Sequence, residues 1–425
     1  MNVPFKRANI LLPKNAEMEK WAVVACDQYT SEPEYWKEVE NIVGDAPSTL
    51  KITLPEIYLE QDNVAERIAN INKEMDHLLS TDFFKTLDNS LIYLERTGAD
   101  GKVRKGLIGM VDLEDYSYEK GSQSLIRATE GTVLERIPPR VRVRENASLE
   151  LPHVMLLIDD EKKEIIEGLT DKVTSEDVVY DFDLMQNGGH VKGYKVPENL
   201  MDGIFKGLEE LADKDNFEAK YDVKDKGVLL FSVGDGNHSL ATAKACYENL
   251  KKTMSEEEAK NSPARYALVE VVNLHSDALE FEPIHRVVFG VEPAKMIEEF
   301  EKYYDVSRTP GEGQKVEYVY EGKNETLYIK NPKSNLAVGS LQMFIDAYIK
   351  EHGGKVDYIH GDDVTKELGS KPGNIGFLLP PMAKTDLFKT VILDGALPRK
   401  TFSMGHSYDK RYYLEARKIN NFERM

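Results

Sequence analysis

The sequence predicts a mixed α/β protein of the α+β kind, with central sheets and more than one domain. Strand-like and helix-like segments alternate along the whole chain, which contains no repeat or low-complexity tract. Charged residues make up 30% of the chain and its mean hydropathy is -0.46, both typical of a soluble globular protein. Because 425 residues exceed the usual size of one core, we expect a domain over 1–160 and a second region over 161–425.

The first region begins with short apolar and helical segments. Residues 22–25 are apolar and predict a strand, and Pro33 suits the start of a helix over 34–43. Apolar residues recur at helical spacing over 64–79, which predicts a second helix. The other elements expected here are strands at 90–96, 104–111 and 149–158.

The second region opens after a turn at 159–163 and again alternates strands with helices. The turn Gln186-Asn-Gly-Gly189 predicts a hairpin, and the apolar run 228–233 predicts a strand covered on both faces. Good helix formers after Ser239 predict a helix directly behind that strand. The remaining elements are expected as helices at 200–213, 293–304, 340–351 and 385–394, strands at 267–274, from 282, at 356–360 and at 375–379, and a hairpin over 318–330.

The turn after the 228–233 strand carries the residues that indicate chemistry most directly. Gly234 and Gly236 permit unusual backbone angles and the close approach of a ligand. Asn237 or Ser239 can cap the helix, whose first amides lack internal partners and favour anions, phosphate above all. The same strand, turn and capped helix is also an ordinary connection in α/β proteins.

Asp235 and His238 favour the anion-binding interpretation of this turn. A purely mechanical turn needs neither a carboxylate nor an imidazole, and side chains at the carboxyl end of such a strand face a crevice. The pattern is not a Walker loop, and it is not a full dinucleotide fingerprint. We therefore expect these two side chains to take part in binding or catalysis.

Three other polar segments are candidate ligand sites, each with a structural alternative. Asp27-Gln28-Tyr29-Thr30 suits a small polar metabolite, with Asp27 as a general base if its environment raises its pKa, or it starts the next helix. Arg127-Ala-Thr-Glu130-Gly-Thr132 suits a carboxylate or phosphate, or forms a salt-bridged loop. Residues 397–411 gather cations, hydroxyls and a histidine, as in loops that close over anions, or form a surface turn. Within 397–411 the candidate residues are Lys400 and His406. Elsewhere, His285 and Arg286 are candidates for which a structural role is favoured.

Composition excludes several partners. The formal net charge of -19 opposes the phosphate backbone, so we expect no nucleic acid partner. The densest basic run, 136–144, alternates arginines with apolar residues, and is either a strand whose arginines pair with local acids or an anion site. The chain has only two cysteines, which indicates a reducing compartment. No helix is expected to carry a pair of histidines at metal-ligand spacing, which disfavours a transition-metal centre. With no apolar stretch near the roughly 20 residues that span a bilayer, and no signal-like start, we expect no membrane partner and a cytoplasmic location.

Four segments, in this order, resemble the DUF1015 family of uncharacterised proteins. They are Gly234-Asp235-Gly236-Asn237-His238, Pro283-Ile-His285-Arg286-Val-Val, Phe377-Leu-Leu-Pro-Pro and Leu397-Pro-Arg-Lys400-Thr401. In that family the central motif usually reads Asp-Gly-His-His-Arg, similar to the phosphate-handling motif of the ParB and sulfiredoxin superfamily, which includes free serine kinases that use ADP or ATP. Asp235, Gly236 and His238 match this motif, whereas Asn237 and Ser239 replace the usual histidine and arginine.

The resemblance implies a ParB/sulfiredoxin-like nucleotide-binding core with an additional α+β domain. It further implies nucleotide-dependent phosphoryl transfer to or from a small hydroxylated metabolite, most directly free serine or phosphoserine, with ATP or ADP and Mg²⁺ as cofactors. The alternatives are a nucleotide-binding regulatory or scaffold protein without turnover and a phosphatase-like hydrolase.

The mechanism that the resemblance implies depends on positioning and charge. The amides at the helix start and His238 hold the polyphosphate, and Asp235 positions Mg²⁺ or the attacking hydroxyl. Asp27 or Glu130 takes the proton. Either the cation missing at position 239 is supplied from elsewhere in the chain, by Arg127, Arg286 or Lys400, or this branch of the family keeps the fold with changed or lost chemistry.

Overall fold

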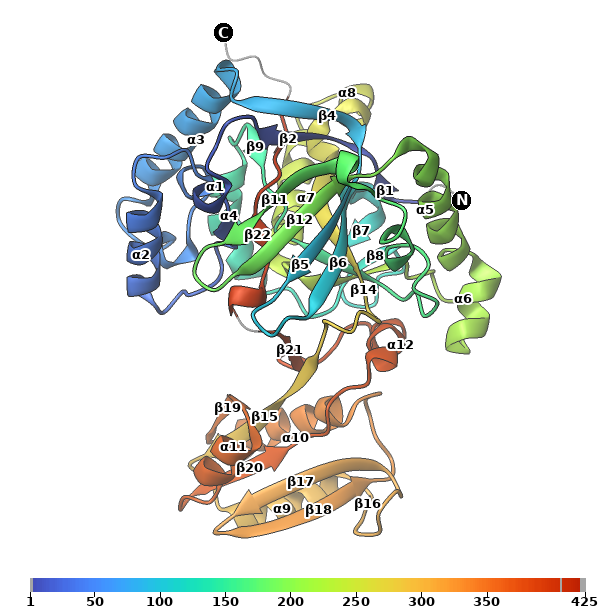
Figure 1. Ribbon diagram of the computed structural model, residues 1–425. Helices are drawn as coiled ribbons and strands as arrows, with labels where there is room; N and C mark the ends of the chain where they lie inside the picture. The colour runs from blue at the N-terminus through green and yellow to red at the C-terminus, as the bar shows by residue number, and fades with distance from the viewer. Residues whose placement is uncertain (1–2, 406, 421–425) are drawn as a thin grey trace. The chain divides into compact units, whose positions relative to one another are not determined.

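The computed structural model describes residues 3–405 and 407–420, and the chain divides into two compact units (Figure 1). Unit 1 consists of Met1–Leu279 together with His406–Met425, and unit 2 is Glu280–Gly405. This division differs from the boundary expected near residue 160. There the chain runs into strand β10 (Met155–Ile158), which lies inside the largest sheet of unit 1.

Within the described residues, unit 1 is built on a ten-stranded sheet, in keeping with the predicted mixed α/β class. At its centre β10 runs parallel to β14 (Tyr266–Asn273) and antiparallel to β13 (Phe231–Asp235). The short strand β8 (Ile126–Ala128) lies parallel on the other side of β13. These strands are almost continuously apolar because both faces of the sheet are covered. The full order is β11 (Val178–Leu184), β12 (Gly189–Lys195), β5 (Ile92–Thr97), β6 (Val103–Asp112), β14, β10, β13, β8 and β7 (Tyr116–Ser117), with β1 (Phe5–Lys6) beside β6.

The four helices predicted for unit 1 are present with shifted ends, and the described residues include four further helices, at 18–21, 137–144, 214–221 and 256–261, that were not predicted. The basic run 136–144 forms the helix α4 (Ile137–Arg144), not a strand. Its prolines occupy the first turn, where a helix needs no backbone N–H and the fixed proline φ is favourable. The expected pairing of its arginines with acids is present, from Arg140 to Glu56 and from Arg144 to Glu150. The other helices are α1 (Met18–Trp21), α2 (Pro33–Val43), α3 (Val64–Ser80), α5 (Glu198–Leu211), α6 (Lys214–Tyr221), α7 (Asn237–Lys251) and α8 (Glu256–Asn261).

The C-terminal segment of the chain is bonded into unit 1 by backbone hydrogen bonds. Strand β22 (Tyr412–Tyr413) pairs with β3 (Val23–Val24), and β23 (Arg417–Lys418) pairs with β9 (Leu149–Glu150). An isolated bridge joins Ala416 to Leu11 within β2 (Ala8–Pro13), which itself pairs with β4 (Phe84–Ser90). Unit 1 is therefore completed by residues that follow unit 2 in the sequence.

Unit 2 contains, among its described residues, a seven-stranded sheet in the order β16, β18, β17, β20, β15 and β19, with β21 beside β15. All the predicted helices and strands from 282 to 394 are present, including the hairpin, with shifted ends. The strands are β15 (Phe281–Phe289), β16 (Val306–Ser307), β17 (Gln314–Tyr320), β18 (Lys323–Ile329), β19 (Lys355–His360), β20 (Asn374–Leu378) and β21 (Phe402–Met404), and the helices are α9 (Pro293–Tyr303), α10 (Ala337–His352), α11 (Asp362–Gly369) and α12 (Lys384–Asp394).

Among the described residues, no helix has both the length and the apolar character that crossing a membrane requires.

Candidate functional site

The candidate site forms where β13 ends and α7 begins. Register pairs Asp235, the last residue of β13, with Met155 at the start of the antiparallel strand β10. Gly236 then adopts a φ of +84°, and a Cβ there would lie 3.1 Å from both the Cδ2 of His153 and the Cα of Val154. The glycine is therefore required both by the left-handed backbone and by the close approach of the chain before β10.

Asn237 and Thr129 connect this turn to the loop that follows β8. The Thr129 amide donates to Asn237 Oδ1, and Asn237 Nδ2 donates to the Thr129 hydroxyl, both at 3.2 Å. The hydroxyl in turn donates to the Val233 carbonyl at 2.7 Å. Since β8 and β13 are parallel, their carboxyl ends meet at one edge, and the loop with Glu130 and Thr132 lies beside the start of α7. Asn237 thus fixes this loop and does not cap its helix.

His238, the second residue of α7, presents an imidazole that the protein itself does not satisfy. Its Nε2 atom is buried and has no hydrogen-bond partner among the described residues. Burial, together with the positive charges of Arg140 on α4 and Arg136 directly before it, lowers the pKa of His238 to about 4. At neutral pH the imidazole is therefore uncharged, beside two arginines and the positive end of the α7 dipole.

Asp27 is held by its neighbour Gln28 and by His153, which is itself held by Tyr413 of the C-terminal segment. Its Oδ2 lies 3.3 Å from His153 Nε2, and Gln28 Nε2 donates to its Oδ1 at 2.9 Å. His153 Nδ1 is 2.6 Å from the Tyr413 hydroxyl, which also accepts from the Cys26 amide. The resulting chain of contacts runs from the C-terminal segment through His153 to Asp27.

The electrostatics of this pair differ from the expectation for a general base. Burial would raise the pKa of Asp27, but the positive charge of His153, with smaller contributions from Gln28 and Lys410, lowers it well below its usual range. Burial would lower the pKa of His153, but its contacts with Tyr413 and Asp27 raise it well above its usual value. Asp27 therefore does not have the raised pKa that the general-base interpretation required, and it remains a carboxylate at neutral pH.

Lys410 is the cation that the structure brings to this site. Its Nζ lies 3.2 Å from Asp235 Oδ2, and both side chains are largely buried. Residues 397–411 gather cations in the sequence, but the candidates predicted there are Lys400 and His406, not Lys410. His153, Tyr413 and Arg136 were not selected either, because each reaches the site through a contact between segments far apart in the sequence.

The site residues fit a hard cation such as Mg²⁺ better than a transition metal. Asp27 and Asp235 offer carboxylate oxygens, and within the described residues they do not belong to a group of three or more metal-ligating side chains. Mg²⁺ is usually bound by one or two carboxylates together with water and substrate phosphates. When bound, Mg²⁺ would neutralise phosphate charge at these two carboxylates.

A pocket of about 160 Å³ adjoins the start of α7. Ser239 and His153 contribute to its lining, and most of the rest is apolar, from the 52–59 segment and the 143–151 segment. Its arginines are already paired with Glu56 and Glu150. The pocket therefore has a mixed lining, with polar side chains at the start of α7 and many apolar ones from the other two segments.

Several predicted substrate residues lie elsewhere or have other roles. The Arg127 guanidinium is buried and donates to the carbonyls of Ser124, Gly227 and Val228, so it holds the β8 segment and does not supply the missing cation. The Tyr29 ring stacks on Tyr35 with centroids 3.6 Å apart. Thr30 is exposed, and His406 lies outside the described residues.

The other three predicted residues belong to unit 2. His285 Nε2 lies 2.8 Å from Asp362 Oδ1, and its Nδ1 accepts from the Leu379 amide. Arg286 is buried and donates to Gln342 and to the carbonyls of Arg399 and Lys400. These contacts agree with the structural role favoured for His285 and Arg286. Lys400 contributes its carbonyl to this cluster, while its side chain is exposed.

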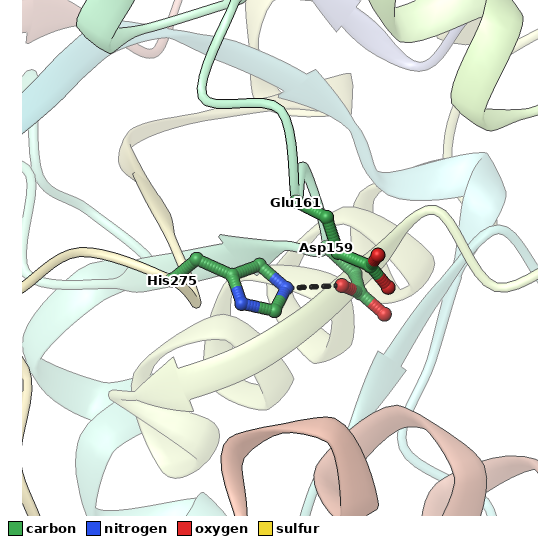
Figure 2. A group of neighbouring side chains, drawn as sticks. All are labelled: Asp159, Glu161 and His275. Carbon is green, nitrogen blue, oxygen red and sulfur yellow. Dashed lines mark hydrogen bonds and ion pairs between the residues drawn. The ribbon is translucent and has the colours of Figure 1, made fainter.

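A second polar cluster lies at the opposite end of β10 (Figure 2). Asp159, Glu161 and His275 place three ligand atoms within 4.8 Å of one another. The spacing of histidines on a helix does not predict this group, because it contains one histidine and two acids that lie in a different segment. His275 Nε2 is 2.6 Å from Asp159 Oδ1. However, the Lys220 ammonium already contacts Asp159 Oδ1 at 3.0 Å and Glu161 Oε1 at 3.4 Å. The negative charge of this cluster is therefore compensated by a lysine, and we assign no metal to it.

The fold and the site together define a mixed α/β protein whose largest sheet presents a polar helix start at one edge. The sequence matches the family described as "Protein of unknown function (DUF1015)" over residues 4–348. The chain therefore belongs to the DUF1015 family. The curated proteins include no match to it.

Solved structures that match this chain include a variant of free serine kinase in complex with AMP. That structure has a TM-score of 0.39 and 11% sequence identity, covering 75% of this chain and 93% of its own. A conserved hypothetical protein from Pyrococcus furiosus matches with a TM-score of 0.34 and 10% identity, over 75% of this chain and 96% of its own. SbnI with a C-terminal truncation from Staphylococcus aureus matches with a TM-score of 0.36 and 11% identity, over 74% of this chain and 87% of its own.

Proposed function

We propose that this protein is a nucleotide-dependent phosphotransferase that acts on a small hydroxylated metabolite, with ATP or ADP and Mg²⁺. Free serine or phosphoserine is the first substrate to test, because the sequence resemblance implies it. The same resemblance leads us to propose that the core of unit 1 is ParB/sulfiredoxin-like.

The observation that carries this proposal is the environment of His238. A buried, unpartnered imidazole nitrogen is costly unless a ligand satisfies it. This nitrogen lies at the start of a 15-residue helix, near Arg136 and Arg140, and Lys410 pairs with Asp235 at the end of the preceding strand. Helix-start amides and cations bind phosphate oxygens, and a neutral imidazole can donate to one of them.

The two carboxylates then take the roles that phosphoryl transfer requires. Asp235 and Asp27 are oxygen ligands for Mg²⁺ or acceptors for the hydroxyl of the substrate. The lowered pKa makes Asp27 a weak base, but a loose phosphoryl transition state needs positioning and charge neutralisation more than proton removal. Asp27 would therefore orient the attacking hydroxyl, with the proton leaving late in the reaction.

The test uses purified protein with Mg²⁺ in both directions. Serine with ATP or ADP should yield phosphoserine, and phosphoserine with ADP or AMP should yield the higher nucleotide, measured by chromatography. Asp235→Ala and His238→Ala should each abolish turnover while the circular dichroism spectrum stays that of the folded protein. His77→Ala and Asp45→Asn, both at exposed positions, are matched controls. Absence of any phosphoryl transfer by the wild-type protein would contradict the kinase assignment.

A nucleotide-binding regulatory protein without turnover is the second candidate. The ion pair of Asp27 with His153 favours it, because a carboxylate already engaged in this way is less available to activate a hydroxyl. Nucleotide-dependent thermal stabilisation without any product would identify this function, since a ligand selective for the folded state stabilises it. Release of inorganic phosphate without an acceptor would instead identify a hydrolase.

A further inference from the structure

The segment that returns from unit 2, residues 407–420, is held in unit 1 at its backbone. Three carbonyls of consecutive residues in this segment accept hydrogen bonds from two buried arginines of the large sheet. Arg96 donates to the carbonyls of Tyr408 and Lys410 at 2.7 and 3.0 Å, and Arg104 donates to that of Asp409 at 2.9 Å. These bonds fix the backbone directly before and at Lys410.

The residue after Lys410 provides a second anchor. Arg411 is almost fully buried, donates to the Pro152 carbonyl, and pairs with Glu270 Oε2 at 2.9 Å and with Glu415. Glu270 is in β14 at the centre of the sheet and also pairs with Arg104. A buried charge network of this kind fixes geometry more reliably than it adds stability.

These anchors direct the Lys410 side chain to the candidate site. Its ammonium lies 3.2 Å from Asp235 Oδ2 and acts on the charge of Asp27. Arg140, in comparison, is bound to Glu56 through two nitrogens, and Arg127 is bound to backbone carbonyls. Among the described residues, the ion-pair partner of Lys410 is thus Asp235, which is itself a proposed magnesium ligand, so the ammonium can be released when a metal binds.

We propose that Lys410 is a phosphate-binding residue of this site, delivered by the C-terminal segment and positioned by Arg96, Arg104 and Arg411. The inference rests on the proposed function. Lys410 supplies the positive charge that Ser239 cannot, moving from Asp235 to a phosphate oxygen when Mg²⁺ and nucleotide bind. This residue lies outside the stretch, 4–348, that matches the family. A single lysine acts here as a point charge on the phosphate.

The first test measures anion binding without turnover, using inorganic tripolyphosphate in the absence of Mg²⁺ and isothermal titration calorimetry. Lys410→Met should weaken binding about tenfold or more, as expected for loss of a charged hydrogen bond. Lys410→Arg should retain most of the affinity. Lys418→Met, an exposed lysine of the same segment, is the matched control and should bind like the wild-type protein.

Asp235→Asn separates phosphate binding from simple neutralisation of Asp235. If Lys410 binds phosphate, Asp235→Asn frees the ammonium and strengthens tripolyphosphate binding, and the double variant Asp235→Asn/Lys410→Met remains weak. If Lys410 only neutralises Asp235, the double variant recovers wild-type affinity, which overturns the inference. Where Lys410→Met does not fold, the comparison of Lys410→Arg with Lys410→Gln replaces it.

The second test separates this inference from the proposed function. When the wild-type protein transfers phosphoryl groups, Lys410→Met should lower kcat by roughly 100-fold or more, with a smaller effect on the KM of the acceptor. Wild-type transfer with an unaffected Lys410→Met variant overturns the inference and leaves the function standing. If the wild-type protein transfers nothing, tripolyphosphate binding still decides the role of Lys410, and absence of that binding in the wild-type protein overturns it.

Discussion

Replacing Asp27 with asparagine should lower the pKa of His153. The two side chains lie 3.3 Å apart, at which distance unit charges attract by about 5 kcal/mol at an effective dielectric constant of 20. This energy corresponds to between three and four pKa units, at roughly 1.4 kcal/mol per unit. The Asp27 side chain is 28% exposed, so solvent screens part of the interaction, and we expect a decrease of about 2 units.

The sign of this change follows from the surroundings of His153. In the wild-type protein the pKa of His153 is raised above 6.5 despite burial, because Asp27 and Tyr413 favour the charged ring. Without the Asp27 charge, fewer contacts oppose the effect of burial, so the pKa of His153 should fall towards its ordinary value. The pair stabilises the fold fully between about pH 3.8 and 6.5. This stabilisation is lost as pH rises through the raised pKa of His153 or falls through the lowered pKa of Asp27.

The assay is a titration of protein labelled with ¹⁵N at histidine, followed by NMR. A His153→Gln variant assigns the signal, and Asp45→Asn, an exposed aspartate, is the control. The reasoning would be refuted if His153 titrated at or below its ordinary value in the wild-type protein. It would equally be refuted if Asp27→Asn changed the pKa of His153 by less than about half a unit.

The remaining predictions concern stability. Glu270→Gln removes the carboxylate that pairs with buried Arg104 and one of the two that pair with buried Arg411, and should cost about 3–5 kcal/mol. The Tm of this roughly 300-residue unit should fall by about 5–8 °C in calorimetry, whereas Glu60→Gln at an exposed position should change nothing. Gly236→Ala should lower the free energy of unfolding by about 1–3 kcal/mol, measured with denaturant. Gly101→Ala, also at positive φ but with open space around it, should lower it less. Equal losses of stability would show that the contact with the β10 segment does not matter. The pKa of His285 is lowered because burial outweighs its carboxylate neighbour, so the stability of unit 2 should decrease as pH falls below 6.5, and His285→Gln should flatten this pH dependence of chemical unfolding.

Local sequence patterns predicted the element that carries the site. The apolar run before Gly234 and the helix formers after Ser239 depend on neighbouring residues alone, and β13 and α7 form there. The same local reasoning failed for 136–144, where alternating arginines resembled a strand. Two prolines at the start of a helical turn outweighed that pattern.

The partners of the site residues could not be predicted in this way. His153 lies beside Gly236 because β10 is antiparallel to β13, a sheet order that hydrophobic periodicity does not predict. Lys410 arrives only after the chain has completed unit 2. The expectation for Asp27 failed for the same reason, since its pKa depends on His153 and not on its sequence neighbours.

The division of unit 1 around unit 2 has a consequence for how the protein is made. Ribosomal synthesis proceeds from the N-terminus, so β3, β9 and Arg96 leave the ribosome long before the residues that pair with them. Until residues 407–420 emerge, Glu270 lacks one of its two arginines and Asp235 lacks Lys410. A product truncated by premature termination would therefore carry a defective core as well as an incomplete candidate site, and its lower stability would expose it to degradation in the cell.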